Sequence, residues 1–514
     1  MFSKVKSCAV HGVDGRMIDV EADVNDGLPV FTMVGYLSSS VREASERVRT
    51  ALKNSGFHLP PKRITINLSP ADMRKDGSGY DLAIATAVLL SLGVTAELPM
   101  EQTLVLGELS LDGSIKAIPG VLPMVICARE EGMTSCIVPK ENVQEAALVQ
   151  GISVIGVSSL QETMEYIQGI KEYENTNVRK PAVDTSEYLY DIDFSDVVGQ
   201  ESIKRGMEIA AAGFHNVLLI GAAGAGKSML AKRLPTILPQ MSFEESLEVT
   251  KIYSVGGMLP PEGGLIHRRP FRAPHHTISE YALIGGGRVP TPGEVSFAHY
   301  GVLFLDELPE FSKPVLEVLR QPLEDRRIRI SRVQASYEFP ADFMFVAAMN
   351  PCPCGNYPDY RRCSCTEQQI RRYQSKVSGP LLDRIDIRME VKGVKQEALF
   401  SKQKTESSKT IRARVEQARQ MQKERFAGTG LLFNSQLDGK NLEEYITLSA
   451  EGKRLVLQLF EEQELSVRGV HRVLKLARTI ADLAGSEEIE NAHLQEAAFY
   501  RNQDVFAKEV LYGN

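Results

Sequence analysis

Residues 217–228 restrict the fold of this chain more than any other stretch of its sequence. They read Val-Leu-Leu-Ile-Gly-Ala-Ala-Gly-Ala-Gly-Lys-Ser, an apolar run followed at once by the pattern Gly-x-x-x-x-Gly-Lys-Ser. Residues 229–234 (Met-Leu-Ala-Lys-Arg-Leu) then have the composition of a helix. A buried strand, a glycine loop and a helix in this order predict a phosphate-binding P-loop. The alternative, a glycine-rich turn that contains a lysine by chance, does not account for the flanking strand and helix.

Each residue type in this loop has a predicted part in holding a nucleotide. Gly221, Gly224 and Gly226 lack a Cβ, so backbone N–H groups can curl around phosphate oxygens. The N-terminus of the following helix adds the positive end of its dipole. Lys227 is expected to reach the β- and γ-phosphates, and the Ser228 hydroxyl to ligate Mg²⁺. The sequence therefore predicts ATP and Mg²⁺ as cofactors.

Length and composition exclude several classes of protein. A chain of 514 residues exceeds the size of one hydrophobic core and predicts about two to four domains. Hydrophobic residues make up 43% and charged residues 24%, as in soluble globular proteins. Because no apolar run reaches about 18 residues and the start lacks a signal-peptide pattern, we expect a cytoplasmic protein without a membrane span. The net charge of −7 leaves local basic patches, rather than the whole surface, for binding nucleic acid.

Residues 1–171 are predicted to form an α/β domain. Alternating apolar segments at 64–68 and 104–107 indicate strands. Apolar segments at 81–90 and 123–132 indicate helices, the second of which closes with a glycine. This pattern alone does not identify an activity.

One part of this domain carries a resemblance to a known family. Residues 107–120, together with 128–132 and 137–142, resemble the proteolytic domain of Lon-type proteases. That family uses a Ser–Lys dyad in which the lysine acts as a neutral base beside the serine. The resemblance implies a Lon-like α+β fold for this part of the chain.

The two dyad positions hold other residues in this sequence. Alignment to the family places Leu122 in the lysine position and Gly79 in the serine position. A slip of one residue would bring Ser78 into register, but no slip supplies the lysine. We therefore expect the fold without peptidase chemistry, and we expect Ser78 to be a loop hydroxyl that caps the helix beginning near Asp81.

A polar, aperiodic linker is predicted at residues 172–192, and the nucleotide-binding domain at residues 193–395. Within this domain an apolar run, residues 301–305, ends in Asp306 and Glu307. A parallel strand presents its C-terminal residues beside the P-loop. Asp306 is therefore expected to hold Mg²⁺ through water, and Glu307 to orient and deprotonate the attacking water. The pair of acids after an apolar run is a stronger signal than either acid alone.

The next apolar run, residues 343–349, ends in Asn350. An amide at this position can hold the attacking water from the side opposite Glu307. In AAA+ ATPases the corresponding residue is called sensor 1. The sequence therefore adds Asn350 to the predicted catalytic set.

Residues 378–386 (Ser-Gly-Pro-Leu-Leu-Asp-Arg-Ile-Asp) resemble a motif of magnesium chelatase and replicative-helicase relatives. The resemblance implies that Arg384 reaches the γ-phosphate bound by a neighbouring subunit. A guanidinium supplied in this way would stabilise the transition-state charge and couple hydrolysis to assembly. The alternative is an intramolecular salt bridge of Arg384 with Asp383 or Asp386.

Two further segments resemble elements that point into the ring of chelatase- and helicase-type AAA+ proteins. Residues 268–288 form a long loop between the P-loop helix and the strand before the acidic pair. Residues 323–332 predict a hairpin, in which alternation places Arg327 and Arg329 on one strand face. Such a hairpin would line the pore and grip phosphates. A solvated charged hairpin is the alternative.

Two groups of residues raise the question of metal binding. His275 and His276 are adjacent on an extended segment and are expected to point in opposite directions, which favours loop hydrogen bonds or pore contacts. Four thiolates that follow sensor 1 suit a tetrahedral, structural Zn²⁺ site, since the loop between them has no core of its own. A labile disulfide pair and reduced, unligated thiols remain the alternatives. The four residues form two Cys-x-Cys pairs within the insert 352–365: Cys352, Cys354, Cys363 and Cys365.

Residues 396–514 are predicted to be a helical linker followed by a helical lid. Apolar residues at i, i+3 and i+4 predict three helices, at 450–461, 468–484 and 492–499. Arg468 opens the middle helix and matches the sensor 2 arginine of AAA+ ATPases, which reaches bound phosphates as the lid closes. Arg472, one turn later, is the alternative.

A Lon-like domain, a chelatase-like AAA+ core with Cys-x-Cys pairs and a short helical lid together resemble the YifB/ComM family of magnesium chelatase-like AAA+ ATPases. The resemblance covers nearly the whole chain. It implies a homo-hexameric ATPase that acts on single-stranded or branched DNA, as a branch-migration helicase in recombination and natural transformation. The alternative is a chelatase-type motor subunit acting on a protein or tetrapyrrole partner, against which the Lon-like domain and the arginine hairpin argue. An ATP-dependent protease would need a lysine where Leu122 stands.

Overall fold

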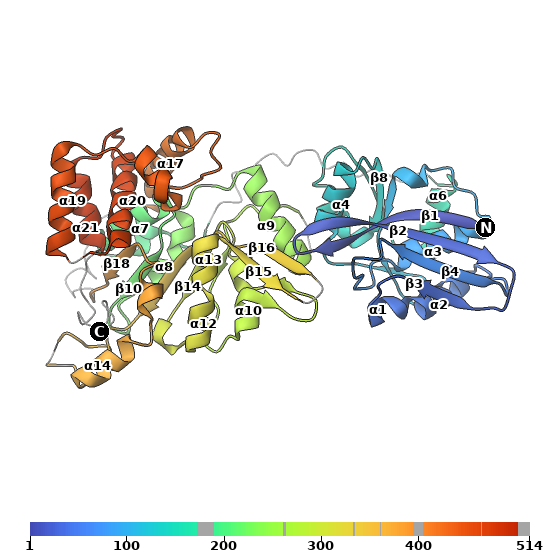
Figure 1. Ribbon diagram of the computed structural model, residues 1–514, viewed down its shortest axis with the longest axis horizontal. Helices are drawn as coiled ribbons and strands as arrows, with labels where there is room; N and C mark the ends of the chain where they lie inside the picture. The colour runs from blue at the N-terminus through green and yellow to red at the C-terminus, as the bar shows by residue number, and fades with distance from the viewer. Residues whose placement is uncertain are drawn as a thin grey trace.

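The computed structural model describes residues 1–171, 190–260, 264–332, 335–359, 361–393, 405–463 and 465–501. Figure 1 shows two lobes along the long axis of the molecule: an N-terminal lobe (residues 1–171) and a C-terminal lobe (the described residues from 190 onward). Most of the predicted linker at 172–192 lies outside the described residues. In the described part of the chain, no helix is long and apolar enough to cross a membrane.

The N-terminal lobe is built on a seven-stranded mixed sheet with the order β3-β4-β2-β1-β5-β8-β9. Its strands are β1 (Phe2–His11), β2 (Asp14–Asn25), β3 (Phe31–Val34), β4 (Arg63–Ser69), β5 (Thr103–Val105), β8 (Ser135–Pro139) and β9 (Ser153–Val157). The helices are α1 (Ser39–Arg42), α2 (Ala44–Asn54), α3 (Asp81–Ser91), α4 (Val121–Glu130), α5 (Val143–Ala146) and α6 (Leu160–Ile167). β1 and β2 pair antiparallel along their length, and α3 and α4 pack on them. The alternating burial of β2 follows from a sheet with one covered face.

The elements predicted in this lobe are present. The strand segments correspond to β4 and β5, and the helical segments to α3 and α4. The cap predicted for Ser78 is wrong, because Tyr80 precedes α3 without a side-chain cap and the Ser78 hydroxyl donates to the Glu108 carboxylate instead. A charged acceptor forms a stronger hydrogen bond than a neutral one. Leu122 is fully buried within α4.

The C-terminal lobe contains a five-stranded parallel sheet with the order β11-β14-β17-β10-β18. Its strands are β10 (Val217–Ile220), β11 (Phe271–Arg272), β14 (Val302–Leu305), β17 (Met344–Met349) and β18 (Ile387–Glu390). The three central strands are buried throughout, as expected when both faces of a parallel sheet are covered. The helices of this domain are α7 (Glu201–Gly213), α8 (Lys227–Arg233), α9 (Phe243–Val255), α10 (Glu280–Ile284), α11 (Glu294–Phe297), α12 (Lys313–Val318), α13 (Arg320–Asp325), α14 (Glu367–Gln374) and α15 (Gly379–Leu382).

The segment 268–288, predicted as a long loop, contributes an edge strand to this sheet. Phe271 and Arg272 form β11 and pair with β14, and the chain then continues into α10. A strand of two residues has no periodic signal, so the sequence did not indicate it. A hairpin is present, with β15 (Arg327–Ser331) paired antiparallel with β16 (Ser336–Pro340), but the predicted range 323–332 is displaced, because α13 extends to Asp325 and β16 lies beyond residue 332.

The C-terminal helices share one hydrophobic core with one face of the parallel sheet, to which β10, β14, β17 and β18 all contribute residues. They are α17 (Ser408–Arg425), α18 (Gly439–Tyr445), α19 (Ala450–Glu462), α20 (Val467–Leu483) and α21 (Asn491–Arg501). The three helices predicted here correspond to α19, α20 and α21. The fold is therefore mixed α/β, with a Lon-like α+β lobe, a parallel P-loop sheet and a helical C-terminus, as the sequence predicted.

A buried carboxylate joins the sheet to the helical C-terminus. Asp386, just before β18, accepts a hydrogen bond from Arg472 of α20 at 2.6 Å and lies 3.4 Å from His215. His215 also hydrogen-bonds Thr479 of α20 at 2.8 Å. Burial by itself would raise the pKa of Asp386, but the hydrogen bond to His215 and the charge of Arg472 outweigh it and hold that pKa well below its usual range.

The two lobes meet where α4 packs against α9. At this contact the Ser254 hydroxyl donates to the buried Glu145 carboxylate at 2.6 Å. Nearby, the ring of His11 at the end of β1 stacks on Tyr337 of the hairpin, with ring centroids 4.5 Å apart. The hairpin therefore lies against the N-terminal lobe, as Figure 1 also shows.

We expect Asp386→Asn to destabilise the protein at pH 7 by about 3–5 kcal/mol, because it breaks the ion pair between the buried Asp386 and Arg472 and leaves the largely enclosed guanidinium without its counter-ion. Since the folded pKa of Asp386 is depressed, its contribution is present above the unfolded pKa of about 3.9 and is lost as the pH falls below it. Urea unfolding followed by circular dichroism at several pH values measures both effects. The control is Asp383→Asn, a half-exposed neighbour 3.9 Å from Arg501, which should change stability by less than about 1 kcal/mol. Equal stabilities of the two variants would contradict the assignment.

Candidate nucleotide site

Three loops leave the same edge of the parallel sheet and bring the predicted nucleotide-binding residues together. Ile220 of β10 pairs with Met349 of β17, and Leu305 of β14 pairs with Ala347 of β17. The P-loop, the acidic pair and sensor 1 therefore leave the sheet at nearly the same level along the strand direction. This is the edge at which open parallel sheets bind ligands.

The P-loop owes its path to its glycines. A Cβ at Gly221 would lie 2.2 Å from the carbonyl oxygen of Val391, so only glycine fits there. Gly224 and Gly226 have φ values of 77° and 93°, in the left-handed region that glycine enters without strain. The predicted strand and helix on either side are β10 and α8.

Lys227 lies at the centre of the site. Its Nζ donates to the carbonyl oxygens of Gly221 at 2.7 Å and Ala222 at 2.9 Å, and to Asn350 Oδ1 at 3.1 Å. Burial lowers the pKa of Lys227, and the carboxylates of Asp306 and Glu307 act in the opposite direction. The structure thus brings the P-loop lysine and the sensor 1 amide into direct contact.

An oxygen pair suited to Mg²⁺ lies beside this lysine. The Ser228 hydroxyl donates to Asp306 Oδ2 at 2.5 Å, so a hydroxyl and a carboxylate converge on one point. Hydroxyl and carboxylate oxygens are the ligands that Mg²⁺ prefers. These two residues therefore fit the metal that the sequence predicted.

Glu307 follows in a constrained conformation. Its φ of 53° is left-handed, and its backbone N–H donates to Asp306 Oδ1 at 2.9 Å, which leaves the side chain 62% exposed. His276 Nδ1 lies 3.9 Å from its carboxylate.

The opposite orientation predicted for His275 and His276 is wrong, because their ring centroids are 4.0 Å apart in a turn rather than on a regular strand. The predicted loop hydrogen bonding is present, since His275 Nδ1 lies 2.9 Å from Thr277 Oγ1.

Arg384 forms an intramolecular ion pair, but not with the acids that the sequence suggested. Its guanidinium donates to the Glu324 carboxylate and to the carbonyl oxygen of Pro380, the latter at 2.8 Å. Glu324 is 60 residues away in sequence, so no local pattern indicated it. Asp386 is instead paired with Arg472, the alternative candidate for sensor 2.

Arg384 and Arg468 line one cavity of about 530 Å³, together with Arg472 and Lys475. Among the described residues that line it, none belongs to the P-loop. Burial lowers the pKa of Lys475 in this cavity to about 8. The structure thus places Arg468 beside Arg384 and not beside Lys227.

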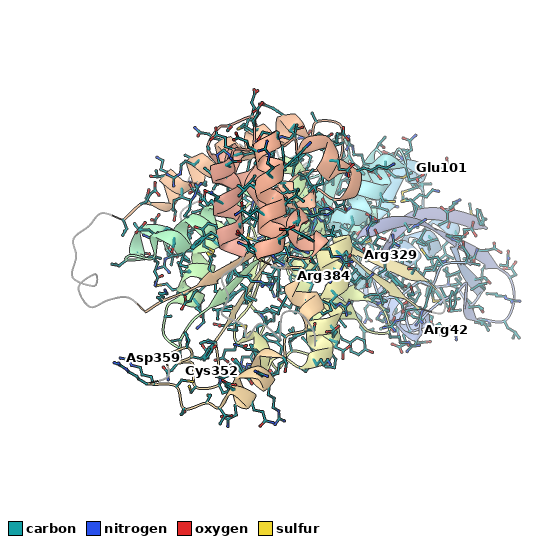
Figure 2. All side chains as sticks on the ribbon, turned by 60° about the vertical axis from the view of Figure 1, so that its left-hand side comes forward. Arg42, Glu101, Arg329, Cys352, Asp359 and Arg384 are labelled. Carbon is teal, nitrogen blue, oxygen red and sulfur yellow. The ribbon has the colours of Figure 1, made fainter. Side chains whose placement is uncertain are left out.

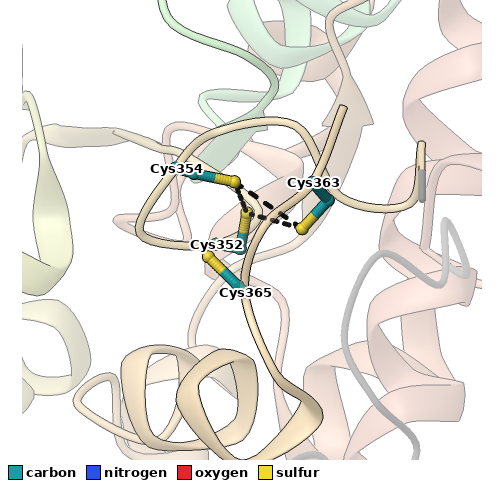
Figure 3. Close-up of side chains that lie close together, drawn as sticks. All are labelled: Cys352, Cys354, Cys363 and Cys365. Atoms are coloured by element: carbon teal, nitrogen blue, oxygen red, sulfur yellow. Dashed lines mark hydrogen bonds between the residues drawn. The ribbon is translucent and has the colours of Figure 1, made fainter. Parts of the chain in front are cut away.

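The four cysteines of the insert come together. Their Sγ atoms all lie within 4.8 Å of one another, and those of Cys352 and Cys354 are 3.4 Å apart (Figure 3). All four thiols are free. Figure 2 shows Cys352 at the end of the C-terminal lobe that lies away from the N-terminal lobe. The predicted cluster is therefore a compact group of four sulfur ligands.

The arginine hairpin has the predicted face. Arg327 and Arg329 both pair with Glu338 on the neighbouring strand, at 2.9 Å and 2.8 Å, while Ile328 between them is buried. The two arginine side chains remain 50% and 58% exposed. Figure 2 shows Arg329 on the side of the lobe that faces the N-terminal lobe.

A parallel sheet that carries a P-loop, an acidic pair and a sensor asparagine at one edge, and that packs against a helical C-terminus, defines a P-loop nucleotide-binding protein of the AAA+ class. Three family models match: "Magnesium chelatase, subunit ChlI" over residues 193–399, "Subunit ChlI of Mg-chelatase" over 20–142, and "Magnesium chelatase, subunit ChlI C-terminal" over 405–501. The chain belongs to this magnesium chelatase-like AAA+ family, in the group that contains YifB and ComM.

The similarity to individual members extends over almost the whole chain. The uncharacterized protein YifB of Escherichia coli is 42% identical over 504 residues, which are 98% of this chain and 97% of that protein. The competence protein ComM of Haemophilus influenzae is 40% identical over 502 residues, 97% of each. Lon protease 2 of Bacillus subtilis is 30% identical over 183 residues, 32% of each, in keeping with a Lon-like lobe.

We expect Lys227→Ala to weaken nucleotide binding and to lower ATP hydrolysis by about 10²–10³-fold, because it removes the buried cation beside the phosphates. Glu307→Gln should lower hydrolysis by about 10²–10⁴-fold while ATP binding is retained, since it removes only the base. Titration with a fluorescent ATP analogue and a steady-state phosphate-release assay separate the two effects. Glu310→Gln, an acid three residues further on that pairs with Lys376 at 3.6 Å, is the matched control and should hydrolyse normally. Normal turnover by Glu307→Gln would rule out its role as the base.

Proposed function

We propose that the protein is a cytoplasmic, Mg²⁺-dependent ATPase that works as a homo-hexameric ring motor on single-stranded or branched DNA. The observation that carries the ATPase part is the convergence of Lys227, Ser228, Asp306 and Asn350 at one edge of the sheet. Membership of the magnesium chelatase-like AAA+ family supports the same activity.

In this proposal each residue of the edge has one task. Lys227 and the P-loop amides bind the β- and γ-phosphates, and Ser228 and Asp306 would hold Mg²⁺. When bound, Mg²⁺ supplies positive charge that neutralises the phosphate oxygens. Glu307 orients the attacking water and accepts its proton, and Asn350 fixes that water from the other side. The hydrogen bond from Lys227 to Asn350 supports this arrangement, because it places the sensor 1 amide directly beside the P-loop lysine.

The ring part of the proposal rests on the position of the arginines. Arg384 and Arg468 line a cavity that includes no described P-loop residue, so both would act on the nucleotide of a neighbouring subunit. Both side chains carry guanidinium groups, which form strong charge-assisted hydrogen bonds with phosphate oxygens.

The DNA part of the proposal rests on two observations. One relative is named a competence protein, and competence concerns the uptake of DNA. The hairpin exposes Arg327 and Arg329 on a single face, as a phosphate-binding element requires. We therefore propose branch migration in recombination or natural transformation as the activity.

A chelatase-type motor acting on a protein or tetrapyrrole partner is the second candidate. The family models that match carry the name of a magnesium chelatase subunit, which favours it. The ATPase rate with and without forked DNA, over a series of salt concentrations, distinguishes the two. Salt-sensitive stimulation supports the DNA motor, and a rate that no DNA changes supports the second candidate.

If Arg384 acts on the nucleotide of a neighbouring subunit, we expect the Arg384→Ala variant to bind ATP normally but to lose at least about 10³-fold in turnover. A mixture of Lys227→Ala and Arg384→Ala subunits, co-purified through two different tags, should recover activity. Recovery follows because some interfaces combine an intact P-loop with an intact arginine. Each variant alone is the control and should stay inactive. If the mixture is also inactive while hexamers form, Arg384 acts within its own subunit.

For the hairpin, the double variant Arg327→Ala/Arg329→Ala should weaken DNA binding and reduce the slope of log K against log salt by about 2. Glu338→Gln is the matched control, because it removes the carboxylate that competes with DNA phosphates for both arginines. It should strengthen DNA binding. Fluorescence anisotropy of labelled DNA measures both. Unchanged affinity in both variants would exclude the hairpin from the DNA interface.

A further inference from the structure

The four cysteine sulfurs are spaced as the ligands of one tetrahedral metal ion. The Sγ atom of Cys352 lies 3.4 Å from that of Cys354 and 3.8 Å from that of Cys363, and the last two are 3.6 Å apart. Zn–S bonds of about 2.3 Å in a tetrahedron place neighbouring sulfurs about 3.8 Å apart. A disulfide would require about 2.05 Å. The spacing of these three sulfurs, with that of Cys365 within 4.8 Å of each, therefore fits a ZnS₄ centre and not a pair of disulfides.

The insert that carries these cysteines has little else to hold it. From residue 351 to 365 the described residues contain no helix or strand, and most of them are exposed or half-buried. Cys352 is an exception, since it is fully buried, and the backbone N–H of Tyr357 lies 3.4 Å from its sulfur. A segment with so small a core depends on cross-links for its conformation.

This insert lies next to the P-loop. A Cβ placed on Gly355 would be 3.5 Å from the backbone nitrogen of Ala223, 4.0 Å from Ala222 Cα and 4.0 Å from Asn350 Cγ. Gly355 lies between the two Cys-x-Cys pairs and has a φ of 80°. A single added side-chain carbon would therefore bring the insert into van der Waals contact with the loop that would surround the phosphates.

The insert is also continuous with sensor 1. Asn350, which accepts a hydrogen bond from Lys227, is two residues before Cys352. Between them, the carbonyl oxygen of Pro351 accepts a hydrogen bond from the buried Gln374 of α14 at 2.9 Å. The cysteine insert thus follows directly after Asn350 at the end of β17 and ends just before α14.

We propose that Zn²⁺ bound by Cys352, Cys354, Cys363 and Cys365 holds the insert against the P-loop and thereby sets the ATP affinity and turnover of the nucleotide site. The proposal rests on the proposed function, because it concerns the same ATP site. Loss of the metal lets Gly355 move relative to Ala222 and Ala223 and frees the backbone that follows Asn350. Supporting residues around a functional centre commonly change activity by about 10–100-fold, and we expect an effect of that size here.

The test uses the full-length protein. Elemental analysis by mass spectrometry should find about one zinc per chain in the wild type and in Lys227→Ala, and none in Cys363→Ser. Removal of the metal from the wild type with a chelator under reducing conditions should weaken binding of a fluorescent ATP analogue and slow hydrolysis. Addition of Zn²⁺ should restore both. Circular dichroism should show that the helices and sheets persist in the metal-free protein, so that the loss is local.

Two variants keep the inference falsifiable if Cys363→Ser fails to fold. Gly355→Val retains all four ligands but places a branched side chain at a left-handed position facing the P-loop, so it should keep its zinc and bind ATP more weakly. Cys127→Ser, a half-buried cysteine of α4 outside the cluster, is the control and should keep both zinc and ATP binding.

The outcomes distinguish the two proposals. Absence of zinc from the wild type, or equal ATP affinity and turnover with and without zinc, overturns this inference and leaves the ATPase proposal intact. Wild-type ATP affinity in a zinc-loaded Gly355→Val also overturns it. A zinc-loaded wild type that does not bind ATP at all overturns the proposed function itself.

Discussion

Hydrogen bonds between the parallel strands β10, β14 and β17 set the heights at which three loops leave the central sheet, and the candidate site depends on this register. Since side chains alternate between faces, a shift of one residue in β14 would exchange the residues packed on its two buried faces and would displace Asp306 from Ser228. The full burial of all three strands opposes such a shift. The same apolar packing that stabilises the sheet therefore also places a lysine, a hydroxyl, a carboxylate and an amide within hydrogen-bonding distance.

Two further groups of polar residues in the C-terminal lobe lie in separate places. One is the cavity that contains Arg384 and Arg468, which continues into the buried junction of Asp386 with Arg472 and His215. Because the ion pair of Asp386 with Arg472 connects α20 to the sheet, a movement of the helical C-terminus would also displace the backbone next to Arg384. The other is the cysteine insert, in which Gly355 lies near the P-loop. The nucleotide site thus has the group of four thiols beside it, whereas no described P-loop residue lines the cavity of Arg384 and Arg468.

The N-terminal lobe contacts the C-terminal lobe through buried and exposed polar groups. Glu145, whose pKa is raised by burial, accepts hydrogen bonds from Ser254 of α9 and from Asn142 of its own lobe. The hairpin lies at the same junction, where His11 stacks on Tyr337. At the positions aligned with the Lon dyad this lobe has Gly79 and the buried Leu122, and the neighbouring Ser78 hydroxyl donates a hydrogen bond to Glu108.

The sequence by itself determined the local elements that carry a strong period or a fixed motif: the P-loop with its strand and helix, the strands before Asp306 and Asn350, the hairpin, and the C-terminal helices. It also determined that four cysteines lie close in sequence. Only the tertiary structure decided which residues meet across long separations, because periodicity reports the face of an element and not its partner. The pairing of Arg384 with Glu324, the position of Arg468 away from Lys227, the edge strand β11 and the approach of Gly355 to the P-loop are all of this kind. Each depends on packing between segments that are remote in the chain, and no local pattern encodes it.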